Sequence, residues 1–339
     1  MRLMVSASQA SGSTPLSLRH GIVAAGWATD PAGDPTTPKA YLDLLRPLYA
    51  AGRRDLPIGR LLEGHVDAVQ IVFRYGTSSQ VAALRARIAA GATLGVWNAG
   101  LPGEPLVLTG GRLTGGKGYA SGAGILTHAL VTANSERGPQ LLLLDLEADP
   151  PAIDREWWQT IGMQRSETHL VRWSGSVIGE DSRIGESGSY AREPFFSGGA
   201  LRFAAVHAGG IAGLLDAVRD HLTTHERASD PFQASRLADL FLLAQGAAAS
   251  IRDTAGAWFS GTDAERLARV SAARLSIAGS AERALTIAQE AVGLPGLFLS
   301  HPLAAKIADL MVYLRQPAPD AHRFRVGQAV AEHILDPIL

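Results

Sequence analysis

The sequence reads Leu113-Thr-Gly-Gly-Lys-Gly-Tyr-Ala-Ser-Gly-Ala-Gly124 between two apolar runs that are typical of β-strands. Its glycines can adopt positive φ, and they let a bulky planar group approach the backbone closely. The stretch therefore predicts a strand-and-turn segment with room for a ligand.

The same region imitates a phosphate-binding loop. Gly111-Arg-Leu-Thr-Gly-Gly-Lys117 has the spacing of that motif. However, Gly118 stands where the motif needs a Ser or Thr hydroxyl for magnesium, and a strand follows instead of a helix. We therefore reject a nucleoside-triphosphatase function.

The alternation Leu113, Gly115, Lys117, Tyr119, Ser121 resembles a segment in the middle β-domain of the acyl-CoA dehydrogenase superfamily. In that family the aromatic residue and the hydroxyl two places later lie against the flavin of FAD. The resemblance therefore implies an FAD cofactor, with Tyr119 and Ser121 at its isoalloxazine ring.

Composition sets broad limits on the function. The chain has 339 residues, 46% hydrophobic and 19% charged, with a net charge of −1 and no cysteine. This balance is typical of a soluble globular protein, and it excludes disulfides, thiolate metal sites and cysteine nucleophiles. We expect neither nucleic-acid nor membrane partners, because the basic residues are scattered.

The location is predicted to be cytoplasmic. Met1-Arg-Leu-Met-Val lacks the long apolar region of a signal peptide. We also find no apolar run approaching the roughly 18 residues that a membrane span requires.

The first part of the chain predicts helices. Apolar residues between 41 and 49 and between 58 and 73 fall on helix faces, and Gly76-Thr-Ser-Ser79 is typical of a helix stop followed by a cap. Arg74-Tyr75-Gly76-Thr77-Ser-Ser-Gln80 resembles the segment that precedes the family's β-domain. The region is short for the family's N-terminal domain.

Strand patterns then occupy residues 92–100, 106–108, 126–133 and 140–146, followed by a Gly162-Met163 segment that resembles the family's exit strand. From residue 195 onward, helical periodicity returns over 195–225, 232–259, 263–292 and 302–315. The predicted fold class is α+β: an N-terminal helical domain (1–90), a middle antiparallel β-barrel or sandwich (91–190), and a C-terminal four-helix bundle (195–339).

Further cofactor contacts follow from the resemblance alone. The family's Val-Thr-Glu-Pro-Gly strand corresponds to a segment with Trp97 at the threonine, Asn98 at the glutamate and Gly100 at the glycine. Its Gln-x-Phe-Gly-Gly-x-Gly segment corresponds to one with Glu290 at the glutamine, followed by Gly293 and Gly296. A carboxylate at 290 would repel FAD phosphates.

The catalytic base is the main departure from the family pattern. Matching Asp309 to the family's Arg-Asp motif puts Pro317 where the basic glutamate belongs, and Asp320 lies three residues further on. Other members carry the base on the first bundle helix, where Glu226 is the best substitute. Arg227 is the corresponding candidate for reaching the FAD of a neighbouring subunit.

Metal binding is not predicted. His221 and His225 have the i, i+4 spacing of zinc ligands, but no third ligand cluster accompanies them. For Ser166 and Thr168, which follow Gly162-Met163, we favour a structural role over ligand contact, because such side chains commonly bond nearby backbone groups.

The resemblance implies a flavin enzyme that removes the α-hydrogen of an acyl thioester as a proton while the β-hydrogen leaves as hydride. Two alternatives remain open. A flavin monooxygenase of the same fold needs no α-proton base, and a non-catalytic homologue would have lost FAD. By the same likeness we expect a homodimer or homotetramer.

Overall fold

A computed structural model of the chain describes residues 13–337. The predicted N-terminal domain starts at residue 1, so its first twelve residues lie outside the described part. Contacts group the rest into two compact units. One comprises the residues up to 34, 60–159 and 164–192; the other comprises 35–59, 160–163 and the chain from 193 onward.

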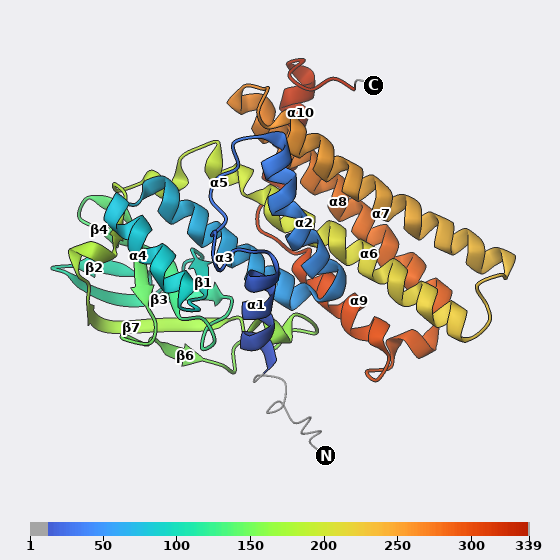
Figure 1. Cartoon of the computed structure of the whole chain (residues 1–339), viewed down its shortest axis with the longest axis horizontal. Coiled ribbons are helices and arrows are strands. Elements are labelled where there is room, and N and C mark those ends of the chain that lie inside the picture. Colours follow the sequence, from blue (N-terminus) through green and yellow to red (C-terminus); the bar gives the residue numbers. More distant parts are fainter. Residues whose placement is uncertain (1–12, 338–339) are drawn as a thin grey trace. The chain divides into compact units, whose positions relative to one another are not determined.

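The first unit, the β unit, is built on an eight-stranded sheet with the order β6-β7-β3-β2-β4-β5-β8, in which β1 also pairs with β4 (Figure 1). Its strands are β1 (Leu94–Trp97), β2 (Val107–Thr109), β3 (Arg112–Ala120), β4 (His128–Ser135), β5 (Gly138–Asp145), β6 (Ala152–Asp154), β7 (His169–Val177) and β8 (Arg183–Ile184). The sheet was predicted to be antiparallel. It is mixed instead, because β4 pairs in parallel with both β1 and β2.

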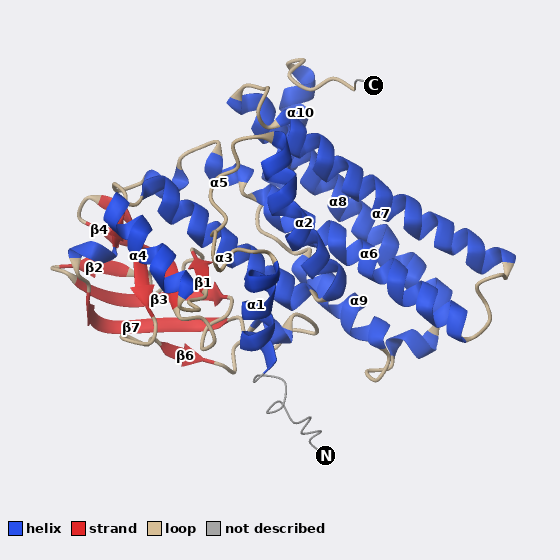
Figure 2. Cartoon of the chain, viewed as in Figure 1, coloured by secondary structure: helices blue, strands red, loops and turns tan. Residues whose placement is uncertain are grey.

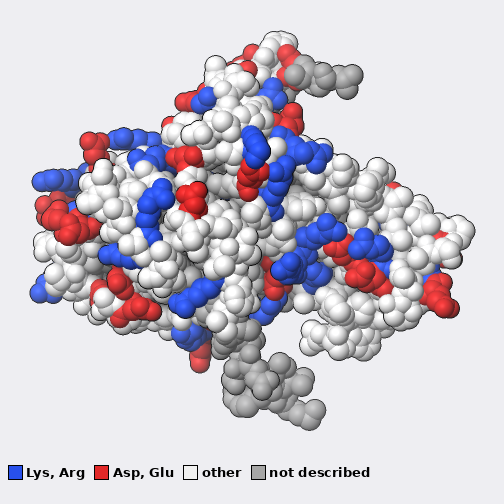
Figure 3. Space-filling model, viewed as in Figure 1, with Lys and Arg blue, Asp and Glu red and all other residues white. Residues whose placement is uncertain are grey.

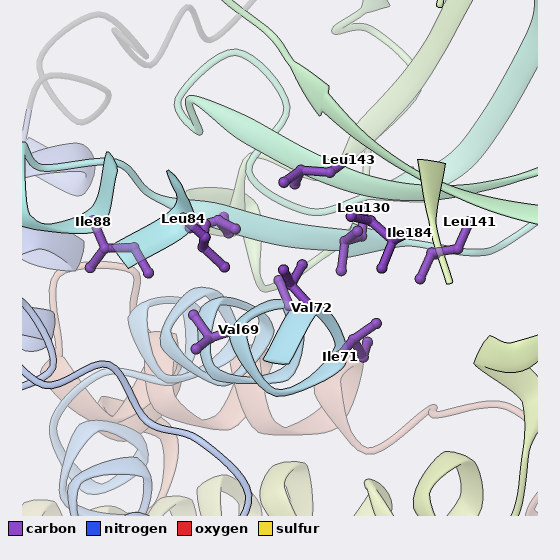
Figure 4. Close-up of a cluster of buried hydrophobic side chains, with 11 residues drawn as sticks. Val69, Ile71, Val72, Leu84, Ile88, Leu130, Leu141, Leu143 and Ile184 are labelled. Carbon is purple, nitrogen blue, oxygen red and sulfur yellow. The ribbon is translucent and has the colours of Figure 1, made fainter. Parts of the chain in front are cut away.

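The β unit also contains the helices α1 (Ser13–Ala24), α3 (Leu56–Tyr75, from Arg60 onward) and α4 (Ser78–Ala89). The expected cap between α3 and α4 is present, since Thr77 and Gln80 form a reciprocal capping box. Figure 4 shows α3 side chains such as Val69 and Val72 facing Leu130 on β4. This contact is part of a buried hydrophobic cluster that also includes residues of α4, β1, β5 and β8.

The second unit, the helical unit, contains the predicted bundle (Figure 2). Its long helices are α6 (Ala200–Thr224), α7 (Pro231–Ala257), α8 (Asp263–Val292) and α9 (Pro302–Tyr313), close to the predicted ranges. The unit also includes α2 (Pro38–Arg54), a short α5 (Phe195–Gly198) and α10 (Pro319–Ala331), which was not predicted.

Glycines bring α2 and α6 into backbone contact. A Cβ at Gly209 would overlap the carbonyl oxygen of Tyr49, and one at Gly52 would overlap that of Val206. Only glycine permits this approach. It explains why α2 packs with the bundle although segments of the β unit come before and after it in sequence.

One segment, Phe195–Thr224, is long and apolar enough to match a membrane span, contrary to the expectation from the sequence. Within its most apolar window, 78% is buried inside the protein. Burial of this kind is typical of a core helix.

On the face drawn in Figure 3, basic and acidic side chains are interspersed.

Candidate functional site

A bulge in β3 exposes Tyr119. The register between β3 and β7 shifts between Lys117 and Ala120, and Tyr119 adopts a left-handed φ of 51°. Bulges redirect side chains, and left-handed backbone is costly for residues other than glycine. As a result, Tyr119 is 59% exposed.

Two tryptophans surround this ring. The centroids of Trp157 and Trp158 lie 4.8 and 6.3 Å from that of Tyr119, both nearly perpendicular to it. The edge-on contacts hold the Tyr119 ring in place and leave part of its surface open. Aromatic faces of this kind suit a planar ligand.

A chain of hydroxyls leads to Ser121. Thr168 Oγ1 donates to Ser121 Oγ at 3.0 Å, and Ser166 Oγ lies 2.8 Å from Thr168 Oγ1. Because Thr168 uses its only proton on Ser121, Ser166 must donate to Thr168. The Ser121 proton then remains for a ligand or water, so Ser166 and Thr168 orient a predicted site residue.

Trp97 supports the site from beneath. Its indole is 1% exposed, and its Nε1 donates to the Ser121 carbonyl at 2.8 Å. The buried ring is therefore not free to stack on a ligand, and the cofactor contact of Trp97 stays a prediction that concerns its backbone. Only its backbone remains available for that contact.

The loop with Asn98 and Gly100 lies along β3. Lys117 Nζ donates to the Asn98 carbonyl at 3.4 Å, Gly100 bridges Lys117, and the Gly118 amide donates to the Ala99 carbonyl. Burial lowers the pKa of Lys117 to about 8. No role was predicted for Lys117 from the sequence, although its position within the Leu113–Gly124 segment could have indicated one.

The β unit thus brings together five of the predicted residues: Trp97, Asn98, Gly100, Tyr119 and Ser121. The other four predicted cofactor residues and the predicted base belong to the helical unit.

Glu226 and Arg227 occupy the turn between α6 and α7, and both are exposed. Glu226 has a left-handed φ of 54°. A carboxylate works as a proton acceptor near neutral pH when it is buried, and the Glu226 side chain is not buried. Its catalytic role remains a prediction.

The segment after α8 has a structural explanation. Glu290 Oε2 lies 4.0 Å from Arg236 Nε, so its charge has a basic neighbour. Gly293 ends α8 with a φ of 73°, and a Cβ at Gly296 would meet Val292 at 2.8 Å. These glycines are required by the turn whether or not a cofactor is near.

The segment at 160–163 is likewise structural. A Cβ at Gly162 would overlap the Ala308 carbonyl, and the Met163 amide donates to Asp309 Oδ1. Asp309, which the sequence matched to the family's aspartate, therefore binds this segment to α9.

The position expected to carry the base faces a cation. Arg274 on α8 donates to the Pro317 carbonyl at 2.7 Å, and the residue as a whole is only 8% exposed. A carboxylate base is missing from position 317, and a buried arginine holds its backbone.

A third histidine joins the predicted pair. His221 Nδ1 lies 3.1 Å from His301 Nε2, and the Leu303 amide donates to His301 Nδ1. His301 therefore caps α9, and its ring nitrogens are both engaged. Over residues 13–337, no group of three or more His, Cys, Asp or Glu side chains has an arrangement that could hold a metal.

Comparison with solved structures identifies the architecture. The dibenzothiophene monooxygenase TdsC of Paenibacillus sp. A11-2, solved with FMN, superposes with a TM-score of 0.74 at 16% identity, covering 96% of this chain and 98% of that chain. The butyryl-CoA dehydrogenase of Megasphaera elsdenii gives 0.76 at 14% identity, covering 96% and 90%. The FAD complex of PigA gives 0.73 at 15%, covering 98% and 99%.

The chain has the acyl-CoA dehydrogenase fold. The likeness was predicted from Leu113–Gly124 and the order of the elements, and the superpositions confirm it. Neither models of known protein families nor curated protein sequences match the chain. In this fold, the exposed Tyr119 and the Ser121 hydroxyl belong to the β-domain segment that suggested the likeness.

Proposed function

We propose that this protein is a flavin-dependent oxidoreductase that binds FAD. The observation that carries the proposal is the exposed Tyr119 ring beside the Ser121 hydroxyl, whose proton is left for a ligand. Solved structures of the same fold include one with FMN and one with FAD.

The β unit fits the edge and face of a flat, polar ring system. Tyr119 would contact its face, Ser121 would donate a hydrogen bond to it, and the exposed Asn98 and Gly100 would lie at its margin. When bound, the flavin supplies the capacity to accept or deliver electrons. Trp97 and Thr168 contribute by holding the Ser121 turn.

Oxygen-dependent chemistry is the reaction type that the helical unit favours. Dehydrogenation of an acyl thioester needs a carboxylate base, and position 317 carries a proline whose carbonyl faces Arg274. Glu226, the substitute candidate, is exposed. A monooxygenase needs no α-proton base, and TdsC has the same fold.

A non-catalytic homologue remains the other alternative. One argument for it was the expected repulsion between Glu290 and the FAD phosphates. Arg236, 4.0 Å from Glu290, reduces that repulsion. We therefore rank it below the two enzymatic alternatives.

The proposal includes a small-molecule or acyl-CoA substrate, a homodimer or homotetramer, and a cytoplasmic location. Exposed apolar side chains on α7, Phe232, Phe241 and Leu242, are compatible with subunit contacts.

Spectroscopy separates the reaction types. FAD-loaded protein is mixed without oxygen either with butyryl-CoA or with NADH and a catalytic amount of a flavin reductase. The monooxygenase proposal predicts that only the second mixture bleaches the flavin and that colour returns on adding air. Bleaching by butyryl-CoA would favour the dehydrogenase instead. Protein that never retains FAD would contradict both.

A further inference from the structure

The helical unit contains a group of basic side chains to which the proposed flavin chemistry gives no role. We call Arg274 on α8, His207 on α6, and His322 and Arg325 on α10 the basic cluster. Arg274 is 8% exposed and His207 3% exposed, while His322 and Arg325 are half-buried.

Arg274 has no counter-charge. Its Nη2 donates to the Pro317 carbonyl at 2.7 Å, and its Cζ lies 5.1 Å from the Phe203 ring centroid. Burial alone lowers its pKa. Across residues 13–337, no carboxylate forms an ion pair with it. The contacts with Pro317 and Phe203 do not supply a negative charge, and a buried cation without a counter-ion is destabilising.

His207 has one ring nitrogen without a partner, although its ring also makes a hydrogen bond to the backbone of Tyr313. Its Nε2 is buried and makes no hydrogen bond within the described part of the chain. Its ring contacts Phe203, the residue under Arg274, with centroids 5.5 Å apart, and it meets Tyr313 edge-on at 4.5 Å. Burial, with Arg274 nearby, lowers the pKa of His207 to about 3.

His322 leaves one ring nitrogen available. Ser271 Oγ gives its proton to the Leu267 carbonyl at 2.8 Å, so it accepts from His322 Nδ1 at 2.9 Å. The Nε2 of neutral His322 is then an unprotonated acceptor.

The charges around His322 are almost all positive. Burial, Arg274 and Arg325 lower its pKa to about 4. On α10, Asp320 pairs with Arg323 at 3.3 Å and is exposed, so this carboxylate does not neutralise the cluster.

We propose that the basic cluster binds a small oxyanion, a carboxylate or a phosphoryl group, that supplies the counter-charge of Arg274. The guanidinium keeps N–H donors that Pro317 does not use. An arriving negative charge also favours protonation of His207 or His322, whose new N–H donates to the anion. Binding therefore takes up a proton and strengthens as the pH falls.

Isothermal titration calorimetry of the full chain tests this with acetate and with sulfate, which do not titrate between pH 6 and 8. We expect binding to be tighter at pH 6 than at pH 8. We also expect the heat of binding to change with the ionisation enthalpy of the buffer, because the buffer supplies the proton that is taken up. Arg274→Met should weaken binding by about tenfold or more. Arg283→Met, exposed on the same helix, should leave it unchanged.

The anion that binds more tightly indicates the class of ligand. Acetate stands in for a carboxylate, and sulfate stands in for a phosphoryl group. Failure of the wild-type protein to bind either anion would overturn the proposal. Equal affinity in Arg274→Met would do the same. If that variant does not fold, the two variants His207→Phe, which keeps a ring against Tyr313, and His322→Phe decide. We expect several-fold weaker binding at pH 6 in at least one of them, and unchanged binding in both contradicts the assignment. FAD binding is not required for any of these outcomes.

Discussion

Tyr119 combines a left-handed backbone with an exposed aromatic ring, and both features are costly for folding. A left-handed φ at a residue other than glycine costs about 1–3 kcal/mol, and exposure forfeits the gain from burying the ring. Pairing on both sides of the bulge in β3 maintains this conformation. Strain of this kind is typical of functional sites, which is why the proposed flavin contact centres on this residue.

Replacing Tyr119 with glycine separates binding from stability. Glycine tolerates the φ of 51°, so we expect the free energy of unfolding to stay the same or rise by about 1 kcal/mol. Loss of the ring should weaken FAD binding by about tenfold. Denaturant unfolding and a fluorescence titration with FAD measure the two effects.

His333→Gly is the matched control, because His333 has a φ of 56° and is also exposed. It should relieve similar strain without changing FAD affinity. A Tyr119→Gly protein with wild-type affinity would remove the residue from the site.

At the scale of helices and strands, the close contact between α2 and α6 decides which elements form each unit. Residue patterns correctly predicted the long helices, because amphipathic periodicity reports local geometry. They did not place α2 in the helical unit. That depends on Gly52 and Gly209 meeting carbonyl oxygens distant in sequence, which no local pattern records.

Gly209→Ala should destabilise the protein by about 1–3 kcal/mol, because the new methyl group overlaps the Tyr49 carbonyl. Gly279 on α8 offers the opposite case, since a Cβ there meets nothing within 4 Å. Gly279→Ala should stabilise by about 0.5–1 kcal/mol. Urea unfolding curves compare them; equal effects of the two substitutions would contradict the packing assigned to α2 and α6.

A buried histidine links α3 to β1 and makes stability depend on pH. His65 Nδ1 accepts from the Leu94 amide at 3.2 Å, and burial lowers the His65 pKa to about 4. Below about pH 6.5 the unfolded chain binds a proton at this residue that the folded chain does not. Stability therefore falls as the pH decreases from 6.5 toward 4.

At pH 5 this loss amounts to about 2 kcal/mol for His65. His65→Asn keeps an acceptor for the Leu94 amide and removes the titration, so the decrease in unfolding free energy between pH 7.5 and pH 5 should shrink by that amount. The exposed His20 provides the control, and His20→Asn should leave the decrease unchanged. Parallel pH profiles for wild type and His65→Asn would contradict burial of a neutral imidazole.

At the scale of the whole molecule, the order of helices, strands and helices predicted the fold, and the superpositions confirm it. Which strands are neighbours could not be predicted from the sequence. Alternation of apolar and polar residues indicates which face of a strand is buried, but it does not indicate that β4 pairs in parallel with β1 and β2. The same limit hid the burial of Trp97 and the contact of Arg274 with Pro317. Both result from contacts between distant segments.

Flavin binding is the property on which the functional account depends. The most direct test is to incubate the purified protein with excess FAD, separate free flavin by gel filtration, and record the visible spectrum of the protein peak. The account predicts flavin absorbance that co-elutes with the protein at close to one FAD per chain. A colourless, correctly folded protein after reconstitution would contradict it.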